Sequence, residues 1–445
     1  MRVDEATLKQ LDLSSAAAKV TTGHLDRFPP LIMDTCLGGP KSPLVPAVVA
    51  RFRAGFPLAS ETLTMPRRGF SPRPVTVMDT ASRTLYTALV AKLSESLTAS
   101  RASEDWERHD KFGPPNADDP FYAEYLVEFD IASCYEYVEH SRLREELLLR
   151  TMDVEHVELC ASFVEELHGR TRGLPQLSES SDVLADTYLE ILERALLRNT
   201  TQVSRFADDF KVEASSWEIA TKIIEDAADQ ARELGLILAA DKTHIWKAAT
   251  LIARREEADA FLNEYFTEAK TALTTIDFLF GGYGSEPIEL PPGEEATVQE
   301  ALRRIFQDWY AGQPTDMPKH SQFLPAALGI LSPPAVRLPD EWLLELVFRQ
   351  ALRLEGVCYY LLARTKEPAE NWVTLSKLAN MKRQSPWAKI WLLHAAKRQE
   401  RAESPATASF DSWASIQLTD RHEVVRAEAA WYLVSRVIND FTVDL

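Results

Sequence analysis

The sequence predicts an α+β fold that continues into an all-α helical domain. Between residue 125 and about residue 234, short apolar segments alternate with helical stretches, which is typical of a mixed sheet with helices packed on it. After about residue 297 the helical periodicity is almost uninterrupted. The length of 445 residues, of which 45% are hydrophobic, suffices for two to four domains with substantial cores.

The strands of the expected sheet are short and bounded by turn residues. Residues 65–77 alternate in a way that predicts strand, turn and strand. Tyr125–Asp130 is an apolar strand that ends on a carboxylate, while Val203–Phe206 and residues 210–214 predict two strands around a tight turn. Helices are expected at residues 79–93, 140–168, 182–198 and 216–234, and a polar loop or insertion at residues 99–120.

The helical C-terminal region contains an internal repeat. Segments beginning at residues 351, 388 and 425 align without gaps, and their basic residues Arg353, Lys389 and Arg426 lie 36 and then 37 residues apart. This period predicts stacked helical pairs. The last copy, from Asp420, resembles a HEAT-type repeat. The alternative is three unrelated amphipathic helices.

Composition excludes several classes of protein. No run of 18 apolar residues occurs, and the first residues lack the layout of a secretory signal. The four cysteines are scattered without a CxxC pair, which argues against a zinc site and suits a reducing cytoplasm, where we expect the protein to be located. The net charge of −18 is unfavourable for binding nucleic acid, but residues 31–100 carry eight Lys or Arg against four Asp or Glu, so a local phosphate site remains possible.

Carboxylates lie at the expected strand ends and would converge if these strands are neighbours in the sheet. Asp130 ends one strand, and Asp208 and Asp209 lie at the tip of the predicted hairpin. Carboxylate oxygens are the ligands that Mg²⁺ prefers, and two such ions can activate a 3′-hydroxyl and stabilise a leaving pyrophosphate. An Asp-Asp pair alone is more often a solvated turn, so its surroundings decide the interpretation.

The surroundings of these acids resemble the reverse transcriptases over roughly residues 62–284. The motifs occur in the family's order: RPVTVMDTASRTLYTAL in the fingers, FDIASCY around Asp130, GLPQLSESSDVLADTYL from Gly173, RFADDF in place of the Tyr-x-Asp-Asp box, and ELGLILAADKT ending on Lys242 and Thr243. The resemblance implies a right-hand polymerase fingers-palm domain and RNA-directed DNA polymerase activity. The expected domains are an N-terminal and fingers region at residues 1–122, a palm at residues 123–296 and a HEAT-like helical repeat domain at residues 297–445.

The resemblance also implies roles for residues of the palm. A metal site of Asp130, Ile131, Asp208 and Asp209 would hold two Mg²⁺ ions, which Mn²⁺ can replace. Tyr135 would lie under the incoming sugar and exclude a 2′-hydroxyl, which favours deoxynucleotides; alternatively it is an aromatic packing residue.

Further roles concern the incoming nucleotide. Gln176, with Gly173 and Pro175, would approach the nascent base pair, and a glycine allows such close approach. Arg73 would pack on the incoming nucleotide, while Arg67 and Arg68 would reach its triphosphate or are ordinary surface residues. Lys242 would donate a proton near the pyrophosphate, or is a solvated lysine at a helix end.

The sequence departs from the family pattern at several positions. Leu177 stands where the family usually has glycine, Asp186 replaces the usual asparagine, and Cys134 occupies a commonly aromatic position. Residues 277–284 only loosely resemble the primer-gripping hairpin, and no standard thumb follows.

A palm followed by helical repeats resembles the bacterial abortive-infection and defence-associated reverse transcriptases. This implies an antiphage enzyme that uses dNTPs to make DNA, either untemplated and protein-primed or guided by a partner non-coding RNA. The helical array would hold the product strand or form a homo-oligomer. Alternatives are a retron-like or group II intron-like enzyme that copies one specific RNA, and a catalytically weak palm that acts as an RNA-binding or toxin scaffold.

Overall fold

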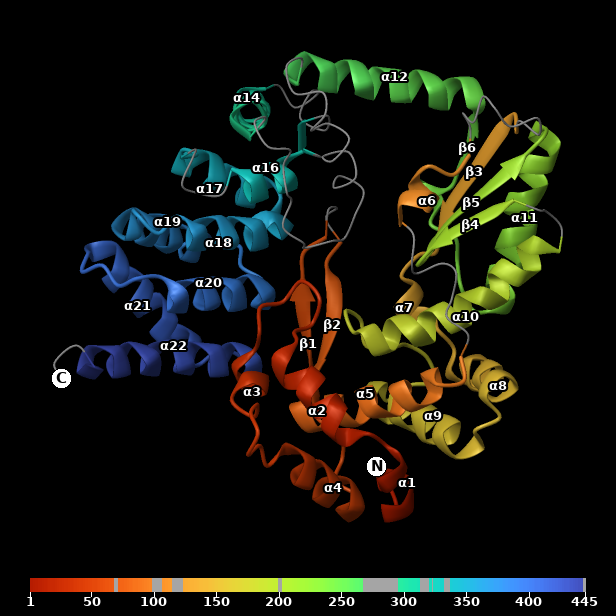
Figure 1. The fold of residues 1–445 in the computed structure, drawn as a ribbon, viewed down its shortest axis with the longest axis horizontal. Coiled ribbons are helices and arrows are strands. Elements are labelled where there is room, and N and C mark those ends of the chain that lie inside the picture. Colours follow the sequence, from red (N-terminus) through yellow and green to blue (C-terminus); the bar gives the residue numbers. More distant parts are fainter. Residues whose placement is uncertain are drawn as a thin grey trace. The chain divides into compact units, whose positions relative to one another are not determined.

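A computed structural model describes residues 1–67, 71–97, 106–113, 123–198, 202–266, 295–312, 320–321, 323–331 and 337–442. The chain forms two compact units that interleave in sequence (Figure 1). The fold class is confirmed, with a mixed sheet in the first unit and an all-helical C-terminal region in the second. The first unit comprises Met1–Gly23, Leu37–Ser60 and Met78–Asp259, and the second His24–Cys36, Glu61–Val77 and Ala260–Leu445. These packing units differ from the segments 1–122, 123–296 and 297–445, which stay predictions about domain boundaries.

A four-stranded antiparallel sheet is the centre of the first unit. Its strand order is β4-β5-β3-β6, so the predicted hairpin β4–β5 pairs along β3. The predicted strands are confirmed, although β5 begins at Asp209 and therefore includes one of the candidate metal ligands. The strands are β3 (Tyr125–Asp130), β4 (Val203–Phe206), β5 (Asp209–Ala214) and β6 (His244–Lys247).

One face of this sheet forms the main hydrophobic core with helices. Side chains that alternate along the strands are buried there, and the rings of Phe129 and Phe210 stack with centroids 5.0 Å apart. Ser216 accepts a hydrogen bond from the backbone N–H of Ile219 and so begins the helix that packs on β3 and β5. The helices of this unit are α1 (Glu5–Gln10), α2 (Leu13–Thr22), α4 (Leu44–Ala54), α5 (Thr80–Ser94), α7 (Cys134–Tyr137), α8 (His140–Thr151), α9 (Val154–His168), α10 (Glu179–Leu197) and α11 (Trp217–Glu233).

A short helix, α6 (Trp106–Asp110), lies within residues 99–120, where the sequence predicted a loop. Its Trp106 ring contacts Phe206 edge to face with centroids 5.0 Å apart, and His109 Nδ1 lies 3.0 Å from Ser204 Oγ. The helix forms because these tertiary contacts with β4 bury its aromatic side chains, and a five-residue helix is not stable alone.

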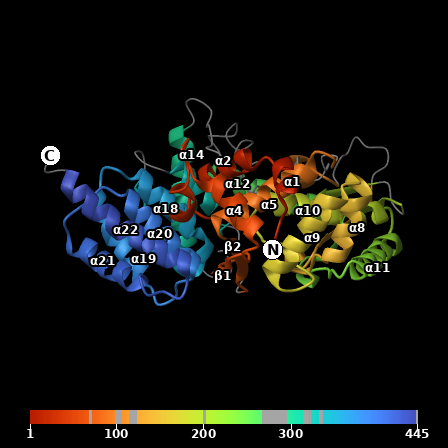
Figure 2. The same cartoon turned by 90° about the horizontal axis from the view of Figure 1, so that it is seen from below.

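The second unit is a stack of helices. α18, α20 and α22 contact one another in succession as one row, while α19 and α21 form a second row beside it (Figures 1 and 2). The three aligned sequence segments fall on α18, α20 and α22, so the repeat corresponds to alternate helices; its assignment to the HEAT type stays a prediction. The helices are α14 (Glu295–Ala311), α16 (Leu324–Ile330), α17 (Asp340–Arg349), α18 (Leu354–Ala363), α19 (Pro368–Ala379), α20 (Pro386–Arg398), α21 (Pro405–Gln417) and α22 (Glu423–Thr442), while α12 (Ala248–Tyr265) begins in the first unit and ends in the second.

Two N-terminal segments pack on this helical array. The indole N–H groups of Trp387 and Trp391 both donate to the backbone carbonyl of Arg27, at 2.6 and 3.0 Å. Glu61, in β1 (Ser60–Met65), accepts from the backbone N–H of Val424 at 2.7 Å, in the first turn of α22. A carboxylate there satisfies helical N–H groups that have no partner within the helix. β1 and its partner β2 (Arg73–Met78) are thus held against the C-terminal helices. The sequence predicts a strand pair at residues 65–77; β2 agrees with this range, but β1 begins five residues earlier and ends at Met65.

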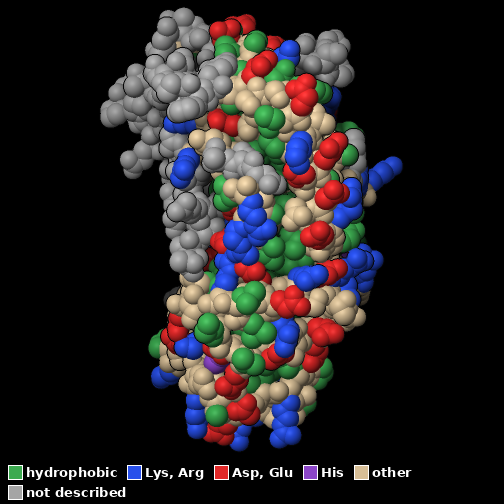
Figure 3. Space-filling model, turned by 90° about the vertical axis from the view of Figure 1, so that its right-hand side faces the viewer, with side chains coloured by type: hydrophobic (Ala, Val, Ile, Leu, Met, Phe, Trp, Pro, Cys, Tyr) green, Lys and Arg blue, Asp and Glu red, His purple; other side chains and the backbone are tan. Residues whose placement is uncertain are grey.

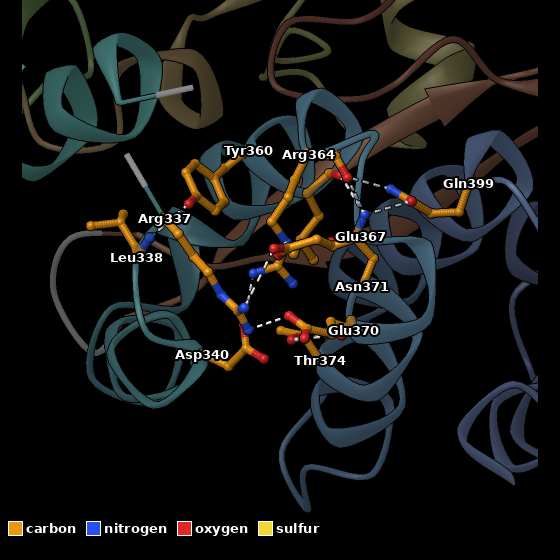
Figure 4. Close-up of polar contacts among 11 residues, drawn as sticks. Arg337, Leu338, Asp340, Tyr360, Arg364, Glu367, Glu370, Asn371, Thr374 and Gln399 are labelled. Carbon is orange, nitrogen blue, oxygen red and sulfur yellow. Dashed lines mark hydrogen bonds and ion pairs between the residues drawn. The ribbon is translucent and has the colours of Figure 1, made fainter. Parts of the chain in front are cut away.

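A buried polar cluster connects α17, α18 and α19 (Figure 4). The guanidinium of Arg364, only 4% exposed, donates to Asp340 Oδ1 at 2.8 Å and to Asn371 Oδ1 at 2.6 Å. At its rim, the half-exposed Arg337 pairs with Glu367 and Glu370. The cluster balances buried charges, as burial of a guanidinium requires.

The helices and the surface charge give two further findings. No helix in the described part of the chain is long and apolar enough to cross a bilayer. On the face that carries α8 and α11, acidic and basic side chains are interspersed (Figure 3). All four cysteines are free.

Candidate active site

Strand pairing brings the three predicted carboxylates together. Asp130, the last residue of β3, is the register partner of Asp209, the first residue of β5. Asp208 lies in the two-residue turn between β4 and β5. Ligand oxygens from all three lie within 4.8 Å of one another, which is compatible with a common metal ion. This is the arrangement that the sequence predicted.

Backbone contacts fix the turn that carries Asp208. Ala207 has a φ of 50°, a left-handed conformation that a two-residue hairpin turn requires. The backbone N–H of Ile131 donates to the carbonyl of Asp208 at 3.2 Å, so the turn is tied to the end of β3. The side chain of Ile131 is fully buried and offers no ligand, so any contribution of Ile131 to the metal site would come from its backbone.

The three acids repel one another electrostatically. Burial, together with the negative charges of Asp130 and Asp208, raises the pKa of Asp209 to about 7. Lys242 Nζ lies 2.5 Å from Asp130 Oδ2. Partial burial opposes the charge of Lys242, yet this ion pair and the other two acids raise its pKa. The excess of negative charge is what a divalent cation would relieve.

Lys242 reaches the acids because its segment extends the sheet. The backbone N–H of Ala239 donates to the carbonyl of Asp130 at 2.8 Å, and that of Ala132 donates to Ile237 at 2.8 Å. A 3₁₀ turn, Ala240–Lys242, then directs the lysine toward the acids. Its predicted role as a proton donor stays a prediction, although its place beside the acids agrees with it.

Hydrogen bonds hold both the side chain and the backbone of Tyr135. Its hydroxyl donates to Asp182 Oδ1 at 2.6 Å, and its carbonyl accepts from the N–H of Leu174 at 2.7 Å. Burial and the neighbouring Asp182 raise the pKa of Tyr135 well above its usual value, so the phenol stays neutral. The half-buried ring both packs on the core and remains partly open, so both interpretations of Tyr135 are compatible with its position.

The loop that begins at Gly173 lies against Tyr135. Gly173 has a φ of 106°, and its carbonyl lies 2.7 Å from Nε2 of His140. Leu177, at the position where the family usually has glycine, also has a positive φ, of 63°. The substitution therefore keeps a backbone conformation that is costly for leucine. The side chain of Gln176 is 6% exposed, and its predicted contact with a base pair stays a prediction.

The predicted fingers arginines belong to the other packing unit. Arg67 follows β1 and Arg73 begins β2, both on the strand pair that packs on the helical array. Arg68 and residues 277–284 lie outside the described residues. The roles of these arginines stay predictions.

Sequence reasoning missed two residues that support the site. Asp182 holds Tyr135, and Arg205 contacts the turn of the catalytic hairpin, where Arg205 Nη1 donates to the carbonyl of Ala207 at 3.2 Å. Arg205 directly precedes Phe206 in the RFADDF motif, but no pattern in the sequence indicates that it is buried.

Comparisons with known proteins agree with this geometry. Residues 65–279 match the family model described as "Reverse transcriptase (RNA-dependent DNA polymerase)", just under half of the chain. No curated protein matches the chain.

Solved structures that match include two telomerases. The structure of telomerase from Candida albicans in complex with a fragment of telomeric RNA shares 11% identity over 85% of this chain, with a TM-score of 0.31. The structure of apo telomerase from Candida tropicalis shares 10% over 86%, with a TM-score of 0.32. The chain spans 64% of the first telomerase chain and 73% of the second. With TM-scores this low, neither likeness bears on what this chain does.

Proposed function

We propose that this chain extends DNA from dNTPs at Asp130, Asp208 and Asp209. It carries a reverse transcriptase domain and so belongs to the RNA-directed DNA polymerase class of nucleotidyltransferases. The observation that supports the proposal most is the convergence of these three carboxylates at the paired ends of β3 and β5. Mutual repulsion among the three clustered acids opposes folding, and metal binding gives a reason for their convergence.

The proposed chemistry assigns a role to each group at the site. The three aspartates would bind Mg²⁺ or Mn²⁺. When bound, these ions would favour deprotonation of the 3′-hydroxyl and stabilise the negative charge of the triphosphate. Lys242, charged and beside Asp130, would hold a proton at Nζ for the leaving pyrophosphate. Tyr135, fixed by Asp182, would exclude a ribose 2′-hydroxyl by its bulk.

We further propose that the enzyme acts in antiphage defence in the cytoplasm. The support is the architecture, a polymerase palm followed by stacked helices. Three modes of synthesis remain: untemplated and protein-primed, guided by a partner non-coding RNA, or retron-like copying of one specific RNA. Assembly into a homo-oligomer through the helical array is part of the same proposal.

The test is nucleotide incorporation by the purified protein. Labelled dNTPs are supplied one at a time with Mg²⁺, with and without added RNA or primer. Product without any added or co-purifying nucleic acid supports untemplated synthesis, whereas product that depends on one co-purifying RNA supports guided or retron-like copying. No product under any condition, from folded protein that binds metal, would favour the scaffold alternative.

The defence role is tested in cells challenged with phage. We expect wild-type protein to lower plaque formation and Asp208→Asn with Asp209→Asn to abolish protection. A matched control is Asp226→Asn with Asp229→Asn, which removes two carboxylates from the solvent side of α11. Deleting the array is a poor test, because residues 27 and 61 would lose their packing partners. Protection by the inactive double variant would contradict the proposal.

A further inference from the structure

A buried arginine connects the catalytic hairpin to helix α10. The side chain of Arg205 is completely inaccessible to solvent, although it belongs to β4 and lies three residues before Asp208. Its Nη1 pairs with Asp186 at 2.6 Å and its Nε with Glu193 at 2.8 Å, both on α10. The same Nη1 donates to the carbonyl of Ala207 at 3.2 Å. One guanidinium thus bridges a helix and the turn of the hairpin.

We propose that Arg205, oriented by Asp186 and Glu193, is a positioning residue that fixes the Ala207–Asp208 turn and thereby the geometry of the metal site. This inference rests on the proposed function, because it assigns the turn a metal-binding task.

The turn needs such a support. A two-residue turn with Ala207 at positive φ is less favourable than one with glycine, so the local sequence does not secure the turn by itself. The Ile131 N–H holds the Asp208 carbonyl from one side, and Arg205 holds the Ala207 carbonyl from another. Consecutive carbonyls are therefore both fixed, and with them the direction of the Asp208 side chain.

The charge of Asp186 follows from the same contact. A guanidinium that is fully buried requires a formal negative charge nearby, which an asparagine amide does not supply. Two carboxylates flank Arg205, and they raise its pKa even though burial acts in the opposite direction. Asp186, in place of the family's usual asparagine, adds to Glu193 a second carboxylate that pairs with Arg205.

Helix α10 positions a second part of the site. Asp182, one turn before Asp186, accepts a hydrogen bond from the hydroxyl of Tyr135. The same helix therefore sets both the metal-bearing turn and the sugar-facing tyrosine. A substitution at Asp186 should therefore change the position of the turn relative to Tyr135, while the three metal ligands themselves remain.

The experiment separates positioning from stability through metal binding, measured as Mn²⁺ affinity by calorimetry or electron paramagnetic resonance. Arg205→Met should weaken Mn²⁺ binding by about 10- to 100-fold, the range for loss of a group that orients metal ligands. The matched control is Arg150→Met: Arg150 pairs with Glu146 and Glu190 and is 16% exposed, but it does not contact the hairpin. It should lose comparable thermal stability and keep its Mn²⁺ affinity.

A double variant decides between a positioning and a merely structural role. Arg205→Met with Asp186→Leu replaces this pair by apolar groups and leaves only Glu193, whose side chain is 18% exposed, without its arginine, so part of the stability that the single variant loses is restored. We expect its Mn²⁺ affinity to stay low, because no donor reaches the Ala207 carbonyl. A stable double variant with wild-type Mn²⁺ affinity would overturn the inference.

A conservative variant covers failure of the double variant to fold. Arg205→Lys keeps the charge, but its single ammonium lacks the planar fork that serves the helix and the turn together. We expect a folded protein with weakened Mn²⁺ binding, and unchanged binding would overturn the inference. Absence of Mn²⁺ binding by the wild type would instead contradict the proposed function, so the two failures are distinguishable.

Discussion

Carboxylates gather in two regions of this protein, and the two regions differ in how charge is balanced. At the ends of β3 and β5, Asp130, Asp208 and Asp209 converge, and the pKa of Asp209 is raised to about 7 although Lys242 pairs with Asp130. In the helical array, carboxylates of α17 and of the start of α19 pair with two arginines instead (Figure 4).

The balance of charge indicates whether a cluster of acids is structural or binds a ligand. In the array each carboxylate meets a guanidinium, so the cluster stabilises the connection between helices and needs no ligand. In the palm the negative charge is in excess, and the fold tolerates it at a cost. An unbalanced cluster on rigid strands points to a cation in function, whereas a balanced one points to structure.

The largest expected effect is on catalysis in the palm. Replacing Asp208 and Asp209 together by asparagine should lower nucleotide incorporation by at least about 1,000-fold, because metal-ion stabilisation is worth several kcal/mol and each 1.36 kcal/mol is tenfold in rate. Single-turnover incorporation measures this effect. Asp226→Asn with Asp229→Asn is the control, and comparable loss in both pairs would mean that general charge removal is responsible.

In the helical array, substitutions of the paired arginines should lower the free energy of unfolding. Arg364→Met removes the buried partner of the largely shielded Asp340, which is 14% exposed, and should cost about 3–5 kcal/mol of unfolding free energy, as expected for one half of a buried ion pair. Arg337→Met, at a site where the arginine is 50% exposed, should cost less than about 1 kcal/mol. Denaturant unfolding measures both values. Equal costs would show that burial is not what distinguishes the two arginines.

In the palm we expect a smaller change in stability, and this one is stabilising. In metal-free protein, Asp209→Asn should raise the melting temperature by a few degrees, since about 1 kcal/mol corresponds to roughly 2–4 °C for a domain of this size. The folded-state pKa of Asp209 is about 7, above the usual 3.8, so the folded state binds the proton more tightly. Stability conferred by this residue is therefore lost as pH rises from about 4 to 7, and the penalty is complete above pH 7.

The control for this prediction is the pH profile itself. Below about pH 4, wild type and Asp209→Asn should have similar melting temperatures, because the carboxyl is protonated in both the folded and the unfolded state. Adding Mg²⁺ at pH 8 should stabilise the wild type more than the variant. A variant less stable than the wild type at pH 8 without metal would contradict the account of unbalanced charge.

Much of the palm was predictable because its signals are local. Tyr125–Asp130 is a short apolar segment that ends on a carboxylate, Val203–Phe206 directly precedes a turn, and Asp208 and Asp209 lie at the predicted tip. That the acids come together follows once β3 pairs with β5, a pairing that the structure supplies.

The rest depends on long-range contacts that sequence patterns do not encode. Arg205 looks like an ordinary strand residue, and only the approach of α10 makes it buried and paired. Helix α6 exists because Trp106 meets Phe206, about 100 residues later in the chain. The packing of Arg27 and Glu61 on the helical array joins residues that are more than 300 positions apart.

The smallest expected effect concerns Asp182, an acid near the site that accepts a hydrogen bond from the Tyr135 hydroxyl. Because the phenol of Tyr135 stays neutral and donates a hydrogen bond, Asp182 contributes a charge-assisted contact. An asparagine oxygen can still accept this bond, weakened by about 1 kcal/mol. Asp182→Asn should therefore lower the preference for deoxynucleotides over ribonucleotides by at most about fivefold.

Competition between a labelled dNTP and the matching ribonucleotide measures this preference, and three further variants on the short helix α7 serve as comparisons. Tyr135→Ala should lose most of the preference, because the ring itself excludes the 2′-hydroxyl. Tyr135→Phe keeps the ring and loses only the hydrogen bond, so it should behave like Asp182→Asn. Tyr137→Phe, two residues along the same helix, should change nothing, since Tyr137 contacts Arg172 through its ring face. If Tyr135→Ala leaves the preference unchanged, Tyr135 is a packing residue, and Asp182 stabilises the fold in the way that the acids of the helical array do.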